Sequence, residues 1–158
     1  MPEVGTIQAI LLVLFFSLFF YRIGAGNLEG LMNYPFWRDM GPLMSQESFK
    51  KLRADHLWKI VPLLVAPFIA EIVVTAVVVF VLPAFIPLLT VLAILALQLV
   101  GAASTVLIQV PIQIRHNRQG YDRPSFDRLI QTDFWLRKVP SFVQAALTLY
   151  VLWLVVAR

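Results

Sequence analysis

The chain has 158 residues, of which 59% are hydrophobic and 14% are charged, and its formal net charge is +4. Soluble domains carry about 25% charged residues, so this composition argues against a soluble domain and favours an integral membrane protein. The sequence contains no cysteine, which excludes disulfides and thiolate metal sites, and its two histidines leave little material for a metal centre. We therefore predict neither a metal nor another cofactor.

Four apolar segments are long enough to cross a bilayer, which takes about 20 helical residues. They cover residues 5–23, 60–82, 85–112 and 139–157. The first has no basic region before it and no clean small-x-small cleavage site after it, so we expect a retained helix and not a signal peptide. The predicted fold is all-α, a single domain over residues 1–158, with four antiparallel transmembrane helices in a bundle.

The distribution of positive charge predicts the orientation of this bundle. Arg22 and the two long connections, residues 24–59 and 111–138, hold twelve of the thirteen Lys and Arg residues. The positive-inside rule places these connections in the cytoplasm and both termini outside, in a bacterial inner membrane. Membrane topology and anionic lipid headgroups account for the basic charge, so we expect the lipid bilayer as a partner and no nucleic acid.

Both long connections contain an amphipathic segment. Residues 46–56 follow Ser45, a typical N-cap residue, and alternate basic with apolar side chains. Residues 125–133 follow a turn and have a similar apolar face. We expect two short interfacial helices in the cytoplasmic loops, with Trp58 and Trp135 marking the membrane interface.

Glu71 is the only Asp, Glu, Lys, Arg or His between Lys59 and Arg115. It lies eleven residues into the second apolar segment, about 16 Å deep at 1.5 Å per residue, which is close to the bilayer midplane. Glu71 and Gln98 are equally distant from the turn between their helices, so Gln98 is the predicted partner of the carboxyl group. Three hydroxyl residues complete a predicted central polar layer: Ser17, Thr75 and Thr148.

Polar residues continue from this layer toward the cytoplasmic side. On the third helix they fall within roughly 80° of one another at about 100° per residue, and the fourth helix has a similar line. We predict that they form a polar seam whose ligand contacts are Gln98, Thr105, Gln109, Gln113, His116 and Gln144. The alternative is that these side chains only form hydrogen bonds between helices.

Three residues are candidates for chemistry at this seam. Glu71 would serve as a buried proton donor or acceptor, His56 as a base at the mouth with His116 as its alternative, and Arg137 as a clamp for an anion or carbonyl oxygen. The competing interpretation makes Glu71 a protonated packing residue that is bonded to Gln98, and makes both histidines interface residues.

Several short motifs resemble those of a group of small bacterial four-helix membrane proteins. They are "NYPFWRDMGP", Asp55–His56, Pro67-x-x-x-Glu71, "LIQVPIQIRHNRQGYD" and "LIQTDFWLRK". This group is distantly similar to the anthrone-oxygenase-like membrane family, which shares a Val-Pro element at the end of helix three and a Trp/Arg pair before helix four. The matching residues here are Val110–Pro111, Trp135 and Arg137.

The resemblance covers most of the chain from Tyr34 onward. It implies a four-helix fold, with cofactor-free oxidation of an aromatic polyketide as one distant activity. The chain departs from the pattern at His116, where an apolar residue is expected, so the resemblance gives His116 no role.

These observations favour a protein that binds or transforms a small lipophilic molecule, such as a quinone or an aromatic compound, in a polar seam open to the cytoplasmic side. The alternative is a non-catalytic accessory subunit of a larger membrane complex, whose partners would be other membrane subunits or further copies of this chain. Ion transport fits less well, because four helices without an internal repeat and with one intramembrane acid make a poor pathway.

Overall fold

The computed structural model describes residues 5–157, which are all-helical apart from short turns. The chain forms four long helices, three of which change helix type along their length. The first comprises α1 (Thr6–Asn27), the π-helical η1 (Leu28–Asn33) and α2 (Tyr34–Met40), followed by a 3-10 turn, η2 (Gly41–Leu43). The second is α3 (Gln46–Val81). The third comprises α4 (Leu88–Ser104), the π-helical η3 (Thr105–Gln109) and α5 (Val110–Gln119). The fourth comprises α6 (Arg123–Asp133), the π-helical η4 (Phe134–Lys138) and α7 (Val139–Val156).

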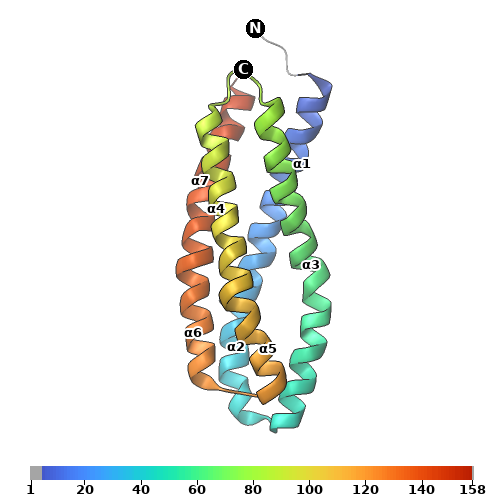
Figure 1. The fold of residues 1–158 in the computed structure, drawn as a ribbon, viewed down its shortest axis with the longest axis vertical. Helices are drawn as coiled ribbons and strands as arrows, with labels where there is room; N and C mark the ends of the chain where they lie inside the picture. The colour runs from blue at the N-terminus through green and yellow to red at the C-terminus, as the bar shows by residue number, and fades with distance from the viewer. Residues whose placement is uncertain (1–4, 158) are drawn as a thin grey trace.

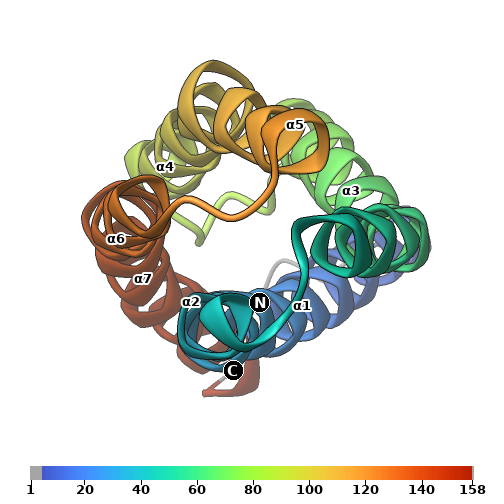
Figure 2. The same cartoon turned by 90° about the horizontal axis from the view of Figure 1, so that it is seen from below.

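The four long helices run antiparallel and form a ring (Figures 1 and 2). α1 packs against α3, α3 against α4, and α4 against α7, while α2 packs against α6 at the opposite end. We call the end that carries the connection between α3 and α4 the turn end. The start of α1 and the end of α7 also lie there, and the other two connections lie at the loop end (Figure 1). All four helices are long and apolar enough to cross a membrane.

Polar and apolar side chains are distributed unlike those of a soluble bundle. Among residues 5–157, thirteen polar or charged residues are buried, as many as the buried hydrophobic ones, whereas large apolar side chains such as Phe80 and Leu89 are 87% and 78% exposed. Soluble helices bury their apolar stripe and expose their charges. The outer surface of this bundle therefore matches a lipid environment better than water.

Two separate hydrophobic clusters close the two ends of the ring. The turn-end core consists of Leu12, Phe15, Val78, Ile86, Val91, Ile94 and Val151. The loop-end core consists of Tyr34, Trp37, Phe49, Phe126 and Leu129, and all five are at most 8% exposed. The space between the two cores contains the polar residues of the site.

The predicted interfacial helices are not separate elements. Residues 46–56 are the first part of α3, which begins after Ser45, and the Ser45 side chain accepts a hydrogen bond from Ser48 N at 3.2 Å. Residues 125–133 belong to α6, which η4 joins to α7 without a break. No glycine or proline interrupts residues 46–61, so nothing separates an interfacial helix from α3. With 36 residues, α3 is about 54 Å long and exceeds the hydrocarbon thickness of about 30 Å.

Candidate functional site

The carboxylate of Glu71 lies in the middle of the ring and is fully buried. Its Oε1 accepts hydrogen bonds from Nε2 of Gln98 at 2.9 Å and from Nε2 of Gln144 at 2.8 Å. Its Oε2 forms an ion pair with Nε of Arg22. The Gln98 contact confirms the pairing predicted from equal depth. Because every one of these partners is a donor, the arrangement matches an ionised carboxylate better than a protonated one.

The side chain of Arg22 links the first long helix to the second, which carries Glu71, and to the fourth. Its guanidinium also donates to Oγ of Ser141 at 3.3 Å and to Oε1 of Gln144 at 2.8 Å, both on α7. The first helix was predicted to end near residue 23, which would place Arg22 at the membrane edge. The helix continues to Met40, which puts Arg22 halfway along the bundle beside Glu71.

The predicted central polar layer is present in part. Oγ1 of Thr75 donates to the Glu71 carbonyl at 2.8 Å and accepts from Gln98 at 2.9 Å. Thr148 is buried at the centre, whereas Ser17 is exposed on the outside of α1 and takes no part.

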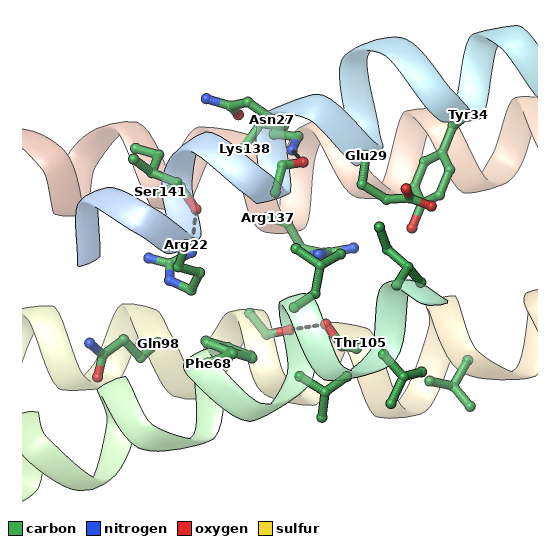
Figure 3. A pocket seen from close by; sticks show the side chains of 18 of the residues that line it. Arg22, Asn27, Glu29, Tyr34, Phe68, Gln98, Thr105, Arg137, Lys138 and Ser141 are labelled. Carbon is green, nitrogen blue, oxygen red and sulfur yellow. Dashed lines mark hydrogen bonds between the residues drawn. The ribbon is translucent and has the colours of Figure 1, made fainter. Parts of the chain in front are cut away.

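A cavity of about 130 Å³ lies on the loop side of the Glu71 cluster and is lined by residues from all four long helices. One side, the apolar wall, comes from α3 and α4 and includes Ile60, Val61, Leu64, Val65, Phe68 and Leu97. The opposite side, the charged wall, comes from the first and fourth long helices and includes Arg22, Glu29, Tyr34, Arg137, Lys138 and Ser141. Figure 3 shows Arg22 and Arg137 facing Phe68 across the cavity.

The cavity lies where the helices depart from regular α-helical geometry. η1 contributes Glu29, η3 contributes Thr105, and η4 contributes Arg137 and Lys138. π-helical turns insert extra residues, widen the helix and occur frequently at functional sites. The remaining helix, α3, contains Pro62 and Pro67 within the segment that supplies its lining residues, although neither proline lines the cavity itself. The three π-helical segments and the proline-containing part of α3 therefore surround the same cavity, and they widen the bundle there.

The charged wall is held by ion pairs behind it. Asp133 is 2.9 Å from NH1 of Arg137 and 3.7 Å from Nζ of Lys138. Nζ of Lys138 also donates to the carbonyl of Gly26, which ties η4 to α1. These contacts fix both cations while they line the cavity.

The acidic side of the wall is fixed in the same way. Glu29 accepts from Nδ2 of Asn33 at 2.6 Å, and its carboxylate lies 3.2 Å from Nε2 of His56. The hydroxyl of Tyr34 accepts a hydrogen bond from Gln113 at 3.1 Å. His56 therefore lies behind Glu29 and does not line the cavity.

The structure divides the predicted site residues into two groups. Five line the cavity: Gln98, Thr105, Gln113, Arg137 and Gln144. The other four, Glu71, His56, Gln109 and His116, do not. Gln109 donates to Thr132 on α6 at 3.1 Å, and His116 stacks on Phe126 in the loop-end core at a ring separation of 4.0 Å. The predicted seam therefore separates into a cavity and a contact with α6.

The loop-end core also closes the predicted cytoplasmic mouth. Trp37, Phe49 and Phe126 fill the ring below the cavity, so the cavity does not continue along the bundle axis to the loop end. Arg53, which belongs to the predicted amphipathic segment 46–56, is fully buried in this core. Its guanidinium lies over the rings of Trp37 and Phe126, 5.2 and 6.0 Å from their centroids.

The burial of Arg53 is hard to predict from sequence, because Lys51 close before it is exposed and Lys50 is half-buried. All three guanidinium nitrogens of Arg53 lack a hydrogen-bond partner among the described residues. Glu29 is an acidic group that interacts with it electrostatically. Arg53 thus gives the loop-end core a positive charge directly behind the charged wall.

Within residues 5–157, no group of three or more His, Asp or Glu side chains is arranged to hold a metal ion. Comparisons with family models, curated proteins and solved structures found no match to the chain. The chemical character of the cavity is therefore the basis for assigning a function.

Proposed function

We propose that this protein is an integral protein of the bacterial inner membrane, with four spans, both termini outside and the loop end in the cytoplasm. Two observations support this placement. The long helices are apolar enough to span a membrane and carry large exposed apolar side chains. Eleven of the thirteen Lys and Arg residues lie in residues 24–59 and 111–138, which include the connections at the loop end, as expected for cytoplasmic loops.

Within the membrane, the protein binds a small lipophilic molecule that carries an oxygen-bearing polar end, such as a quinone or an oxygenated aromatic compound. The observation that carries this proposal is the cavity with one apolar and one charged wall. Binding sites for small molecules are mostly apolar concave spaces with a few fixed polar groups that orient the ligand. The apolar wall receives the body of the ligand, and the charged wall receives its oxygen atoms.

The charges around the cavity favour an acceptor or an anion over a cation. Four cations are buried or largely buried here, Arg22, Arg53, Arg137 and Lys138. Three carboxylates face them, Glu29, Glu71 and Asp133. Four cations against three carboxylates leave one positive charge in excess. A carbonyl, phenolate or carboxylate oxygen on the ligand would accept hydrogen bonds from the three cations that line the cavity, Arg22, Arg137 and Lys138.

The same charges allow a chemical role. A carbonyl oxygen held at Arg137 would be polarised, because guanidinium groups stabilise negative charge that develops on oxygen. Glu71 would act on such a ligand only through Arg22 and the two glutamines that hold it, so its role is to position these cavity residues.

The experiment is a binding measurement in lipid nanodiscs with 2,3-dimethyl-1,4-naphthoquinone, followed by quenching of tryptophan fluorescence. The wild-type protein is expected to bind this probe saturably. Leu64→Trp fills the cavity from the apolar wall and abolishes saturable binding. Leu63→Trp is the matched control, because Leu63 is adjacent in sequence, 53% exposed and not among the lining residues.

Two results would overturn the proposal. In the first, the wild-type protein binds no oxygenated bicyclic probe saturably. In the second, Leu64→Trp and Leu63→Trp bind the probe equally well. Native mass spectrometry of protein extracted in mild detergent tests the alternative function. Stoichiometric partner chains with no bound small molecule would favour the accessory-subunit interpretation.

A further inference from the structure

The most exposed residues that line the cavity come from α3 and from the start of α5. Among its lining residues, the exposed ones are Val61, Val65 and Val110, which are 40%, 42% and 42% exposed. Val61 and Val65 are one turn apart on the same face of α3, and Val110 begins α5, which packs against α3. We call this place, where the wall of the cavity is a single layer of side chains, the valine portal.

Packed side chains or polar contacts lie in three other directions. The loop-end core fills the axis of the bundle below the cavity, and the Glu71 cluster with the turn-end core fills it above. Between the first and fourth long helices, Arg22 bonds to Ser141 and Lys138 bonds to the carbonyl of Gly26. A molecule that enters along the axis or between these two helices would have to break buried polar contacts, whereas the valine portal contains only apolar side chains.

The position of the portal along α3 indicates the depth at which it opens. Trp58 lies one turn before Val61 and is 82% exposed. Exposed tryptophans concentrate at the boundary between lipid headgroups and acyl chains. In the membrane placement proposed above, the valine portal opens just inside this boundary, into the acyl region of the loop-side leaflet.

We propose that the ligand is a membrane-dissolved amphiphile that enters the cavity sideways from the loop-side leaflet through the valine portal. Its apolar body stays against α3 while its polar end reaches across to Arg137, Lys138 and Ser141. The charged wall lies opposite the portal, so the orientation of an amphiphile in the leaflet is retained as it moves inward. This inference rests on the proposed function for the nature of the ligand, but the route can be tested without any ligand.

The natural chain has no cysteine, so single cysteines report access to the cavity cleanly. Ser141→Cys places a thiol on the charged wall, and Thr105→Cys serves as a second position in case the first variant folds poorly. In nanodiscs, each thiol is reacted either with N-phenylmaleimide, which dissolves in the bilayer, or with a methanethiosulfonate carrying a sulfonate, which stays in water. Each rate is divided by the rate of the same reagent at Lys51→Cys, an exposed position.

The expected result is a relative rate for the bilayer-dissolved reagent that exceeds that of the water-borne reagent by about tenfold or more, because the portal faces lipid. Adding Val61→Trp should slow the reaction with N-phenylmaleimide by about tenfold, since it places a bulkier side chain at the valine portal. Val73→Trp is the control, because Val73 is 55% exposed on the same helix and does not line the cavity.

Equal relative rates for the two reagents would overturn the lateral route, and so would a rate that Val61→Trp leaves unchanged. Neither result would touch the proposed function, which depends on probe binding in the wild-type protein. Conversely, absence of probe binding together with slow, lipid-selective labelling would reject the ligand and keep the route.

Discussion

Arg22 on α1 and Glu71 on α3 form a buried ion pair halfway along the bundle, and the pair is completed by hydrogen bonds from Gln98 and Gln144. Each carboxylate oxygen has at least one donor. A buried charge left without its partner is costly, whereas a pair replaced as a whole by apolar residues is often tolerated. The stability of this centre should therefore depend on the two residues jointly.

Arg22→Met should lower the free energy of unfolding by about 3 to 5 kcal/mol, because it leaves the carboxylate buried and unpaired. The double variant Arg22→Met with Glu71→Met should be more stable than Arg22→Met alone. Reversible denaturation in mixed detergent, followed by circular dichroism, measures both values. Glu71→Met alone is measured in the same way. If the effects of Arg22→Met and Glu71→Met simply add in the double variant, the two residues do not act as a pair.

The contact between Glu71 and Gln98 was predictable from sequence, but the contact between Glu71 and Arg22 was not. The first needs only the short turn between α3 and α4, which fixes equal depths on two neighbouring helices. The second needs the length of the first helix, and its glycines at 24, 26 and 30 argue locally against continuation. Packing against α3 and α6 overrides this weak propensity, and Arg22 consequently lies well inside the bundle.

The division of the polar seam was hidden for a different reason. A regular 100° per residue does not hold from Gln98 to His116, because η3 is π-helical over Thr105–Gln109 and changes the phase of the residues after it. Gln109 and His116 contact α6 and do not line the cavity, whereas Gln113 still lines it. The sequence carries no reliable signal for such a segment, because π-helical turns are stabilised by tertiary contacts.

Arg53 offers the opposite case to Arg22, since its buried guanidinium has aromatic neighbours but no hydrogen-bond partner among the described residues. Each buried donor without a partner costs about 1 to 3 kcal/mol. A cation–π contact contributes about 2 kcal/mol, which does not offset the total cost of several such donors. Arg53→Met should therefore leave thermal stability unchanged or raise it. A fall in the melting temperature as large as that of Arg22→Met would contradict this account.

Gly30 in η1 is required by the close approach of the fourth long helix. A Cβ atom there would overlap the Asp133 carboxylate and the end of the Lys138 side chain, both of which are pinned by other contacts. Gly30→Ala should destabilise the protein by about 1 to 3 kcal/mol through overpacking. Gly24→Ala is the control, since nothing lies within 4 Å of the added atom, and it should stabilise the helix by about 1 kcal/mol. Thermal denaturation of both variants in the same detergent tests the difference, and equal melting temperatures would show that η4 can move away.

The charged wall should contribute to binding through the ligand's oxygen and not through its ring. Arg137 lines the cavity from η4, so Arg137→Gln should weaken the binding of 2,3-dimethyl-1,4-naphthoquinone. A hydrogen bond to a charged group contributes about 1.5 to 3 kcal/mol, which corresponds to a factor of about 10 to 100 in Kd. Arg128→Gln, on the exposed face of α6, is the matched control and should leave Kd unchanged.

The same pair of variants should be measured with 2,3-dimethylnaphthalene, which has the ring system without the carbonyl oxygens. Because this hydrocarbon has nothing for Arg137 to bind, its Kd should be the same in Arg137→Gln and in the wild-type protein. A loss of affinity for the hydrocarbon equal to the loss for the quinone would mean that Arg137 only shapes the cavity. A loss confined to the quinone assigns the hydrogen bond to the charged wall and fixes the direction in which the ligand lies.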